Sequence, residues 1–371
     1  MSSDPGRSRG PSTRTIHAGV PPGAQGEPLL PGPVLAAPYH LRGPADAAPY
    51  GYGRDANPSW THLERALGEL DGGDAVVFAS GMAALTAVLM TSLRPGDVLV
   101  ACGDGYPGVR ALAEERLGPL GIETRLVPTD TAALREAAAG AALVWLETPS
   151  NPRLDVCDIA AVAEAAHAAG ALAAVDNTVA TPLGQKPLAL GADIAMLSGT
   201  KSLCGHSDVL LGAVSAADPE RAAALRRWRS QSGSIAGGFE AWLAHRSLAT
   251  LGLRLERSSA NAAVLAARLR ERPDVLEVVH PSGPVAERQM ACAGPLVGFT
   301  LASAERAQAF LEACELVAEA TSFGGVHSTA ERRARWRTDA VADGFIRFSA
   351  GCEDAADLLA DVERALDATA G

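Results

Sequence analysis

The sequence has no apolar stretch long enough to span a bilayer, and its first fifteen residues lack the apolar core of a secretory signal. Its six cysteines, at positions 102, 157, 204, 292, 314 and 352, form no Cys-x-x-Cys pair and have no histidine at metal-ligand spacing. These absences predict a cytoplasmic protein in a reducing compartment, with free thiols, no metal site and no contact with a membrane.

An excess of positive charge is also missing, since the formal net charge is −11. A protein that binds nucleic acid needs a basic surface, so we expect no nucleic-acid partner. No internal repeat is visible. The 371 residues, of which 47% are hydrophobic, are sufficient for one large subunit of two or three domains.

Three regions differ in their patterns. Residues 1–58 are rich in Pro, Gly and Ala without a sustained period, which predicts an N-terminal extended arm. Residues 59–245 alternate short apolar runs with helical stretches, which predicts an α/β domain with a mostly parallel seven-stranded sheet and helices on both faces. The predicted strands are 75–79, 98–102, 124–127, 141–147, 172–176, 194–197 and 210–214.

The remaining residues, 246–371, predict a smaller α+β C-terminal domain. A single long helical stretch, 239–272, leads into it. Short strands at 275–279, 297–301, 316–318 and 345–349 are expected to follow, with helices at 304–314 and 354–368.

The most informative segment is Ser198-Gly199-Thr200-Lys201, which follows the apolar run 192–197. A lysine at the end of a buried strand is desolvated, so its pKa falls and its amine becomes nucleophilic. The neighbouring hydroxyls suit a phosphate. The alternative is an ordinary loop lysine in water.

Other strand ends carry complementary groups. Gly81, between Ser80 and Met82 at a helix start, allows an anion to approach free N–H groups. Tyr106 offers a ring for stacking, Asn151 a fixed amide, and Asp176 a carboxylate that needs a cation such as a protonated ring nitrogen. Each also has a structural reading, as a turn, a core side chain or a cap. Because the carboxyl ends of parallel strands share one sheet edge, the set together matches what pyridoxal phosphate requires.

A competing pattern is Gly-x-Gly-x-x-Gly at 103–108, which lies between a predicted strand and a helix. It raises a dinucleotide-dependent oxidoreductase as a remote alternative. Pro107 stiffens the turn, Tyr106 places a ring where the pyrophosphate would approach, and the motif follows the second strand of the domain. We therefore give it little weight.

The chain resembles the cystathionine γ-lyase/γ-synthase family of pyridoxal-phosphate enzymes, from Thr15 to its end. The resemblance is carried by an ordered set of motifs: Tyr52-Gly53-Arg54 with Asn57-Pro58, Ala79-Ser80-Gly81-Met82-Ala83-Ala84, Glu147-Thr148-Pro149-Ser150-Asn151-Pro152, Asp176-Asn177-Thr178, Ser198-Gly199-Thr200-Lys201, Gly205-His206-Ser207-Asp208, Ser322-Phe323-Gly324-Gly325 and Ile346-Arg347-Phe348-Ser349. It implies the type I fold of pyridoxal-phosphate-dependent transferases.

The resemblance also implies residue roles. Lys201 is expected to form the Schiff base with the cofactor and to move protons, and Tyr106 to stack on the ring and to serve in acid–base steps. Asp176 would pair with the ring nitrogen and Asn151 with the ring hydroxyl. Ser80, Gly81, Met82, Ser198 and Thr200 are the phosphate residues, joined by Tyr52 and Arg54 of a neighbouring subunit. Arg347 with Ser322 would hold the α-carboxylate of an amino-acid substrate.

The implied activity is γ-elimination of L-cystathionine to cysteine, 2-oxobutanoate and ammonia, in a homotetramer built from two active dimers. Cystathionine γ-synthase, methionine γ-lyase and β-lyase activities stay open as alternatives, because the chain departs from the family at the expected substrate end. His327 stands where the lyases usually carry a glutamate, and we expect it to bind the substrate, with a structural histidine as the alternative. An arginine cluster, 332–337, follows; we expect a solvated or intersubunit face in preference to a site for a distal carboxylate.

Overall fold

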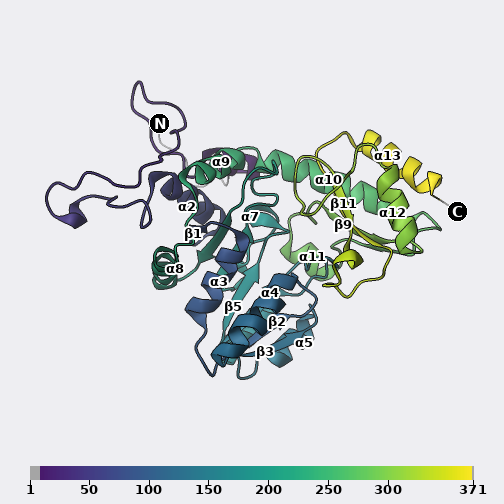
Figure 1. Cartoon of the computed structure of the whole chain (residues 1–371), viewed down its shortest axis with the longest axis horizontal. Coiled ribbons are helices and arrows are strands. Elements are labelled where there is room, and N and C mark those ends of the chain that lie inside the picture. The colour runs from purple at the N-terminus through teal and green to yellow at the C-terminus, as the bar shows by residue number, and fades with distance from the viewer. Residues whose placement is uncertain (1–8, 370–371) are drawn as a thin grey trace.

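The computed structural model describes residues 9–369 (Figure 1). Within the predicted arm, residues 1–8 lie outside the described residues, and the rest is mostly irregular apart from α1 (Pro11–His17) and one 3₁₀ turn (Ala45–Ala47). Figure 1 shows this segment as a purple loop that projects from the body of the molecule. The arm ends where α2 (Pro58–Asp71) begins, capped by the Asn57 side chain.

The central sheet has seven strands in the order β1-β7-β6-β5-β4-β2-β3, with β7 antiparallel to both of its neighbours and the other pairs parallel. The strands are β1 (Asp74–Phe78), β2 (Val98–Cys102), β3 (Glu123–Val127), β4 (Leu143–Glu147), β5 (Leu172–Asp176), β6 (Ile194–Ser198) and β7 (Gly212–Ala216). The predicted fold class is confirmed, and every predicted strand of this sheet is present.

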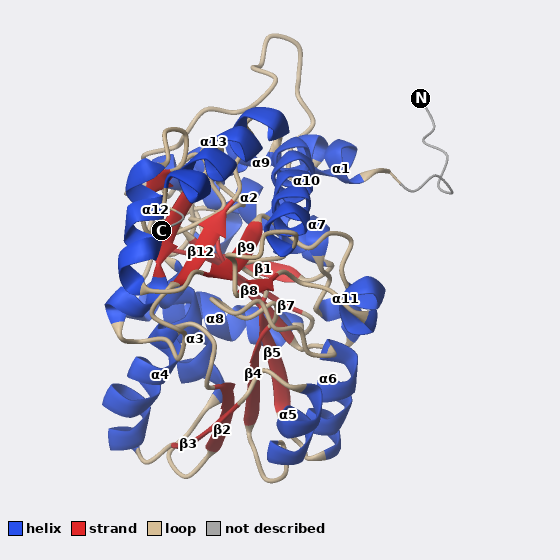
Figure 2. Cartoon of the chain, turned by 90° about the vertical axis from the view of Figure 1, so that its right-hand side faces the viewer, coloured by secondary structure: helices blue, strands red, loops and turns tan. Residues whose placement is uncertain are grey.

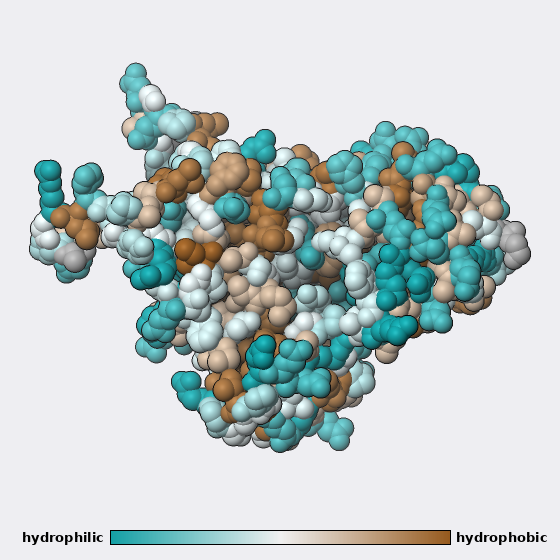
Figure 3. Space-filling view, in the orientation of Figure 1, coloured by the Kyte–Doolittle hydropathy of each residue, from teal (hydrophilic) through white to brown (hydrophobic). Residues whose placement is uncertain are grey.

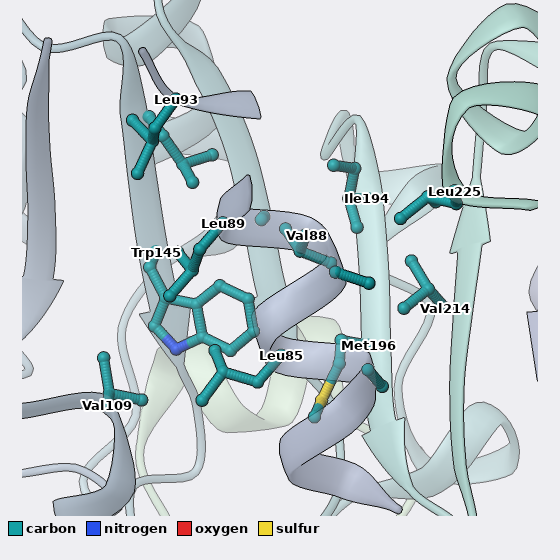
Figure 4. Packing of buried hydrophobic residues seen from close by; sticks show 14 of the residues in the cluster. Leu85, Val88, Leu89, Leu93, Val109, Trp145, Ile194, Met196, Val214 and Leu225 are labelled. Carbon is teal, nitrogen blue, oxygen red and sulfur yellow. The ribbon is translucent and has the colours of Figure 1, made fainter. Parts of the chain in front are cut away.

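Helices cover both faces of this sheet, because its strands are buried on both sides. One face carries α3 (Gly81–Ser92), α4 (Pro107–Leu112) and α8 (Pro219–Ser232); the other carries α2, α5 (Thr131–Ala137), α6 (Ile159–Ala168) and α9 (Gly238–Leu248). Figure 4 shows Trp145 of β4 packed beside Leu85 and Leu89 of α3. This packing fixes where α3 begins, and therefore where the polar turn before it lies.

A second sheet follows α10 (Leu251–Arg270), in the order β10-β11-β12-β9-β8 (Figure 2). Its strands are β8 (Glu277–Val279), β9 (Leu296–Thr300), β10 (Ala318–Glu319), β11 (Thr329–Arg332) and β12 (Phe345–Ser349). The helices α10, α12 (Ala304–Ala313) and α13 (Ala355–Ala368) form its apolar core. Two short helices, α7 (Thr181–Gly184) and α11 (Pro284–Gln289), complete the chain.

Two predicted elements are corrected. The single helix 239–272 is two helices, α9 and α10, since the buried Arg254 side chain donates to the Ser247 carbonyl near the break. The predicted domain boundary at 245/246 consequently falls inside α9, and the division into domains stays a prediction. The strand expected at 210–214 begins instead at Gly212, because the Leu211 backbone bonds to Thr200.

A third correction is β11, a strand that the sequence did not predict and that ends at Arg332, the first residue of the arginine cluster. Only four residues long, it pairs with β12 so that Glu331 stands opposite Arg347. So short a strand, rich in charged residues, has no apolar alternation by which the sequence could reveal it.

The surface shows where the arm differs from the rest of the chain. Leu29, Leu35 and Leu41 are 94%, 74% and 54% exposed, and Figure 3 shows hydrophobic residues on the projecting segment. In residues 9–369, no helix is both long and apolar enough to cross a membrane.

Candidate active site

A cavity of about 370 Å³ lies at the carboxyl ends of the parallel strands, between the two sheets. Eleven of the predicted site residues line it, although they come from widely separated parts of the chain. They are Ser80, Gly81, Met82, Tyr106, Asn151, Asp176, Ser198, Thr200, Lys201, Ser322 and Arg347. The structure thus brings together the strand-end groups that the sequence pattern predicted.

One wall of the cavity suits a phosphate. The N–H groups of Gly81 and Met82 open α3 and have no acceptor within the helix, while the Ser80 side chain caps the Ala83 N–H at 3.1 Å. A Cβ on Gly81 would lie 2.8 Å from the Ser198 Cβ, so only glycine lets the helix start approach the end of β6. Thr200 lies on the same wall, its hydroxyl bonded to the Leu211 backbone at 3.1 Å.

Asp176 is held by a relay of hydrogen bonds. Its Oδ1 accepts from the Thr178 N–H at 2.9 Å and from the Thr178 hydroxyl at 2.5 Å, and that hydroxyl accepts the Ser198 N–H at 2.8 Å. Burial raises the pKa of Asp176, while Thr178 and Lys201 lower it. No described residue donates a hydrogen bond to Asp176 Oδ2, so this oxygen is available to a cation in the cavity.

Lys201 stands opposite these groups. Its pKa is lowered, first by burial and then by the Arg347 cation, as expected for a desolvated amine. Its Nζ lies 5.5 Å from the centroid of the Phe323 ring, and the Arg347 Cζ lies 5.2 Å from the same centroid. One aromatic ring therefore contacts both the expected nucleophile and the expected carboxylate-binding group.

The turn with Tyr106 explains the glycine pattern at 103–108. The Glu147 carboxylate accepts the Tyr106 N–H at 2.5 Å, and Arg110 donates to the carbonyls of Gly103 and Gly105 at 2.8 and 2.7 Å. Burial and the nearby Asp176 raise the pKa of Glu147 well above its usual value. A carboxylate that occupies the backbone donor of this turn competes with a pyrophosphate, so the geometry does not support a dinucleotide site.

Arg347 is buried, and its guanidinium donates to three oxygens among the described residues. Its Nη1 donates to Asn151 Oδ1 at 2.6 Å, and its Nη2 to the Ser322 carbonyl at 2.9 Å and to Glu331. Ser322 adopts a left-handed backbone conformation, with φ of 73°. Burial lowers the pKa of Arg347 to about 10, while Glu331 raises it.

Three predicted residues are not brought to this cavity. Tyr52 and Arg54 lie in the arm, where the Arg54 guanidinium stacks on the Tyr52 ring at 5.2 Å. His327 is exposed and is not among the cavity-lining residues. The expected contact of His327 with the substrate stays a prediction.

The arginine cluster is also corrected. Arg333 lines the cavity, is 8% exposed and pairs with Glu331 and Asp339, so it is not part of a solvated face. Arg335 and Arg337 are exposed, as predicted. The sequence did not identify Glu331 or Thr178 as residues near the cavity. Had residues 329–332 been recognised as a strand beside the predicted strand 345–349, the register would have placed Glu331 opposite Arg347.

The residues present fit pyridoxal phosphate. The cavity offers backbone N–H groups to an anion at Gly81, a carboxylate to a cationic ring nitrogen at Asp176, and an amine to an aldehyde at Lys201. The cysteines offer no comparable chemistry: burial raises the pKa of Cys102 and Cys204 to about 12.

The fold and cavity define a pyridoxal-phosphate-dependent enzyme that acts on amino acids. A model of the family described as "Cys/Met metabolism PLP-dependent enzyme" matches residues 12–367. The chain belongs to this family, and its cofactor is pyridoxal phosphate.

Known proteins agree over nearly the whole chain. A Streptomyces coelicolor protein, whose name as a cystathionine γ-lyase is provisional, is 54% identical and covers 97% of this chain and 94% of its own length. The Bacillus subtilis cystathionine γ-lyase is 39% identical and covers 86% of this chain and 89% of its own length. The Xanthomonas oryzae cystathionine γ-synthase, solved with aminoacrylate and cysteine, has a TM-score of 0.93 at 34% identity. The match covers 98% of this chain and 99% of that protein.

Other relatives carry different activities in their names. At 37% identity these are a cystathionine β-lyase of Coxiella burnetii, an L-methionine γ-lyase of Pseudomonas deceptionensis and a cystathionine γ-synthase of Mycobacterium tuberculosis. They cover 95%, 86% and 96% of this chain, and 97%, 86% and 97% of their own lengths. The family is therefore shown, and the particular reaction is a separate question.

Proposed function

We propose that this protein cleaves L-cystathionine by γ-elimination, consuming water and releasing cysteine, 2-oxobutanoate and ammonia. The observation that carries the proposal is a single cavity in which Lys201 and Arg347 flank the same Phe323 ring, so that an amine and a carboxylate-binding group meet one amino acid. The names of the Streptomyces coelicolor and Bacillus subtilis relatives support the choice of cystathionine.

Pyridoxal phosphate, when bound, supplies an aldehyde for an amine and an electron-withdrawing ring that accepts the electrons released at Cα. Lys201 Nζ, with its lowered pKa, is the base that takes the Cα proton and passes a proton to and from Cβ. Asp176 Oδ2 would hold a protonated ring nitrogen of the cofactor, and the Thr178 hydroxyl, bonded to Oδ1, fixes the direction of that carboxylate.

The remaining side chains orient the substrate and the leaving group. Arg347 is cationic near neutral pH and holds the α-carboxylate, with Asn151 and Ser322 fixing its plane. Tyr106, 42% exposed at the cavity mouth, is placed to stack on the ring and to donate a proton to the departing sulfur.

We also propose that the active unit is a dimer within a homotetramer. The support is that Tyr52 and Arg54 lie outside their own cavity, on an arm with exposed leucines, so a neighbouring subunit can receive them at its phosphate. Measured mass in solution, together with activity of a mixture of Arg54→Ala and Lys201→Ala chains, tests this: mixed dimers regain one intact site.

The reaction is tested with the purified holoenzyme and a panel of L-cystathionine, L-methionine, O-succinyl-L-homoserine with cysteine, and L-cysteine. We expect cystathionine to give 2-oxobutanoate and one equivalent of cysteine. Pyruvate from cystathionine would show β-elimination instead, and turnover of the ester with cysteine alone would show a synthase.

The lysine assignment has a separate test, because the chain contains only two lysines, Lys186 and Lys201. Borohydride reduction of the holoenzyme should fix the cofactor mass on the peptide with Lys201. The Lys186 peptide is the internal control, since its amine donates to the Leu70 carbonyl away from the cavity. Label on Lys186 would overturn the assignment.

A further inference from the structure

The register of β11 and β12 places a row of charged side chains beside the cavity. Glu331 pairs directly across from Arg347, so both project from the same face of the sheet. The opposite face of the two strands, with Ala330 and Phe348, packs into the apolar core of the second sheet. Arg333 follows Glu331 by two residues and also lines the cavity.

Their hydrogen bonds form one chain of alternating charge. Glu331 Oε1 accepts from Arg347 and, at 2.8 Å, from Arg333 Nη1. Arg333 Nε and Nη2 in turn donate to Asp339 Oδ2 at 2.9 and 2.5 Å. Along these hydrogen bonds the order is Arg347, Glu331, Arg333 and Asp339, so the two positive and two negative charges cancel.

The segment beside Asp339 is hydrogen-bonded to α4, which packs on the central sheet. Thr338, the residue before Asp339, accepts a hydrogen bond from the Arg110 guanidinium, which also holds the Gly103 and Gly105 carbonyls beside Tyr106. The side chains of Glu331 and Asp339 are 2% and 1% exposed. Buried charges with partners on both sides cannot move singly without leaving a charge unpaired.

The electrostatics explain why a second arginine is needed. Burial lowers the pKa of Arg347, and Glu331 is the group that most strongly raises it. A lone glutamate beside the substrate would, however, repel the α-carboxylate. Arg333 offsets the Glu331 charge while leaving its hydrogen bond to Arg347 in place.

We propose that Glu331 and Arg333 are positioning residues that set the orientation and the net charge of the Arg347 site, and so determine how tightly an α-carboxylate binds. This inference rests on the proposed role of Arg347 in substrate binding. It does not depend on which amino acid is cleaved.

The test measures equilibrium binding of two unreactive ligands to the holoenzyme, followed by the absorbance of the bound cofactor. L-Norleucine carries an α-carboxylate, and L-norleucinamide replaces it with a neutral amide. We expect Arg333→Met to weaken L-norleucine binding by about 10- to 100-fold, the loss of a charge-assisted contact, and to change L-norleucinamide binding by less than about twofold.

Two further variants separate positioning from a general loss of structure. Arg333→Lys keeps the charge and should recover most of the L-norleucine affinity, whereas Arg335→Met, which removes a surface arginine paired with Glu319, should bind both ligands as the parent does. If Arg333→Met fails to fold, the double variant Arg333→Met/Asp339→Asn also removes the Asp339 carboxylate, which would otherwise be left without its arginine. This variant should likewise bind L-norleucine more weakly.

An equal loss for both ligands, or no loss in either folded variant, overturns the proposal. The proposal would also be overturned if Arg333→Met weakened binding only of ligands with a second, distal carboxylate. L-2-Aminosuberate, which has that carboxylate, is compared with L-2-aminooctanoate, which does not. Such a result would mean that Arg333 contacts the substrate itself. These outcomes are independent of the proposed reaction, because holoenzyme that fails to cleave cystathionine can still be titrated with both ligands. If the parent enzyme does not distinguish norleucine from its amide, the Arg347 role itself is wrong.

Discussion

The two ends of the cavity are built differently. The cofactor end uses short local motifs at the carboxyl ends of β1, β5 and β6, and each group there is fixed mainly by its own turn. The substrate end uses Arg347 of β12, Glu331 of β11 and Asp339 of the following loop, joined by ion pairs across strands. The residues expected to bind the cofactor are thus placed by local sequence motifs, whereas the proposed site for the substrate carboxylate depends on tertiary contacts.

Removal of Lys201 breaks the cofactor end most completely. We expect Lys201→Ala to lower the rate of 2-oxobutanoate release from cystathionine by more than about 10⁴-fold, because the nucleophile and the proton carrier are one group. The unfolding temperature of the protein without cofactor should stay close to that of the parent. Full activity in the variant would refute the assignment.

Glu331→Gln tests the substrate end through stability. It leaves two buried guanidiniums facing each other without the anion between them, so the free energy of unfolding should fall by about 3–5 kcal/mol. Urea unfolding monitored by tryptophan fluorescence measures this. The control is Glu363→Gln at the exposed pair with Arg268, where the expected loss is about 0–1 kcal/mol. Equal losses would mean that the buried network has no special importance.

Asp176→Asn tests the electrostatic part of the cofactor end. An amide cannot hold a positive charge on the ring nitrogen, so kcat should fall by about 100- to 1000-fold. Thr178→Val keeps the carboxylate but removes the hydroxyl that donates to its Oδ1, and should cost roughly tenfold. A larger effect from Thr178→Val than from Asp176→Asn would contradict this order of importance.

The smallest effect joins the two ends. Since the Arg347 cation contributes to the lowered pKa of Lys201, Arg347→Met should raise that pKa. The neutral amine of Lys201 is the form that reacts with the cofactor aldehyde. The pH at which the protein without cofactor binds added pyridoxal phosphate at half its maximal rate should therefore move upwards. Stopped-flow absorbance across a pH series measures the shift; a downward movement would show that Arg347 does not act on Lys201 through its charge.

Sequence reasoning succeeded where the necessary signal is local. The turn at Ser80-Gly81-Met82 and the Asp176 and Lys201 strand ends follow apolar runs whose length and period predict buried strands, and the parallel topology places their ends at one edge. It failed at 329–332, where a strand of four mostly polar residues gives no periodic pattern.

The sequence by itself determined the α/β fold, the family and the strand-end residues that line one cavity, because alternating apolar runs and a set of motifs in fixed order are properties of the chain alone. Only the tertiary structure decided that Arg333 faces the cavity while Arg335 faces solvent, and that Glu331 lies between two arginines. The physical reason is that a buried charge is stable only beside its partner, and these partners are brought together by the β11–β12 register and by the loop that carries Asp339.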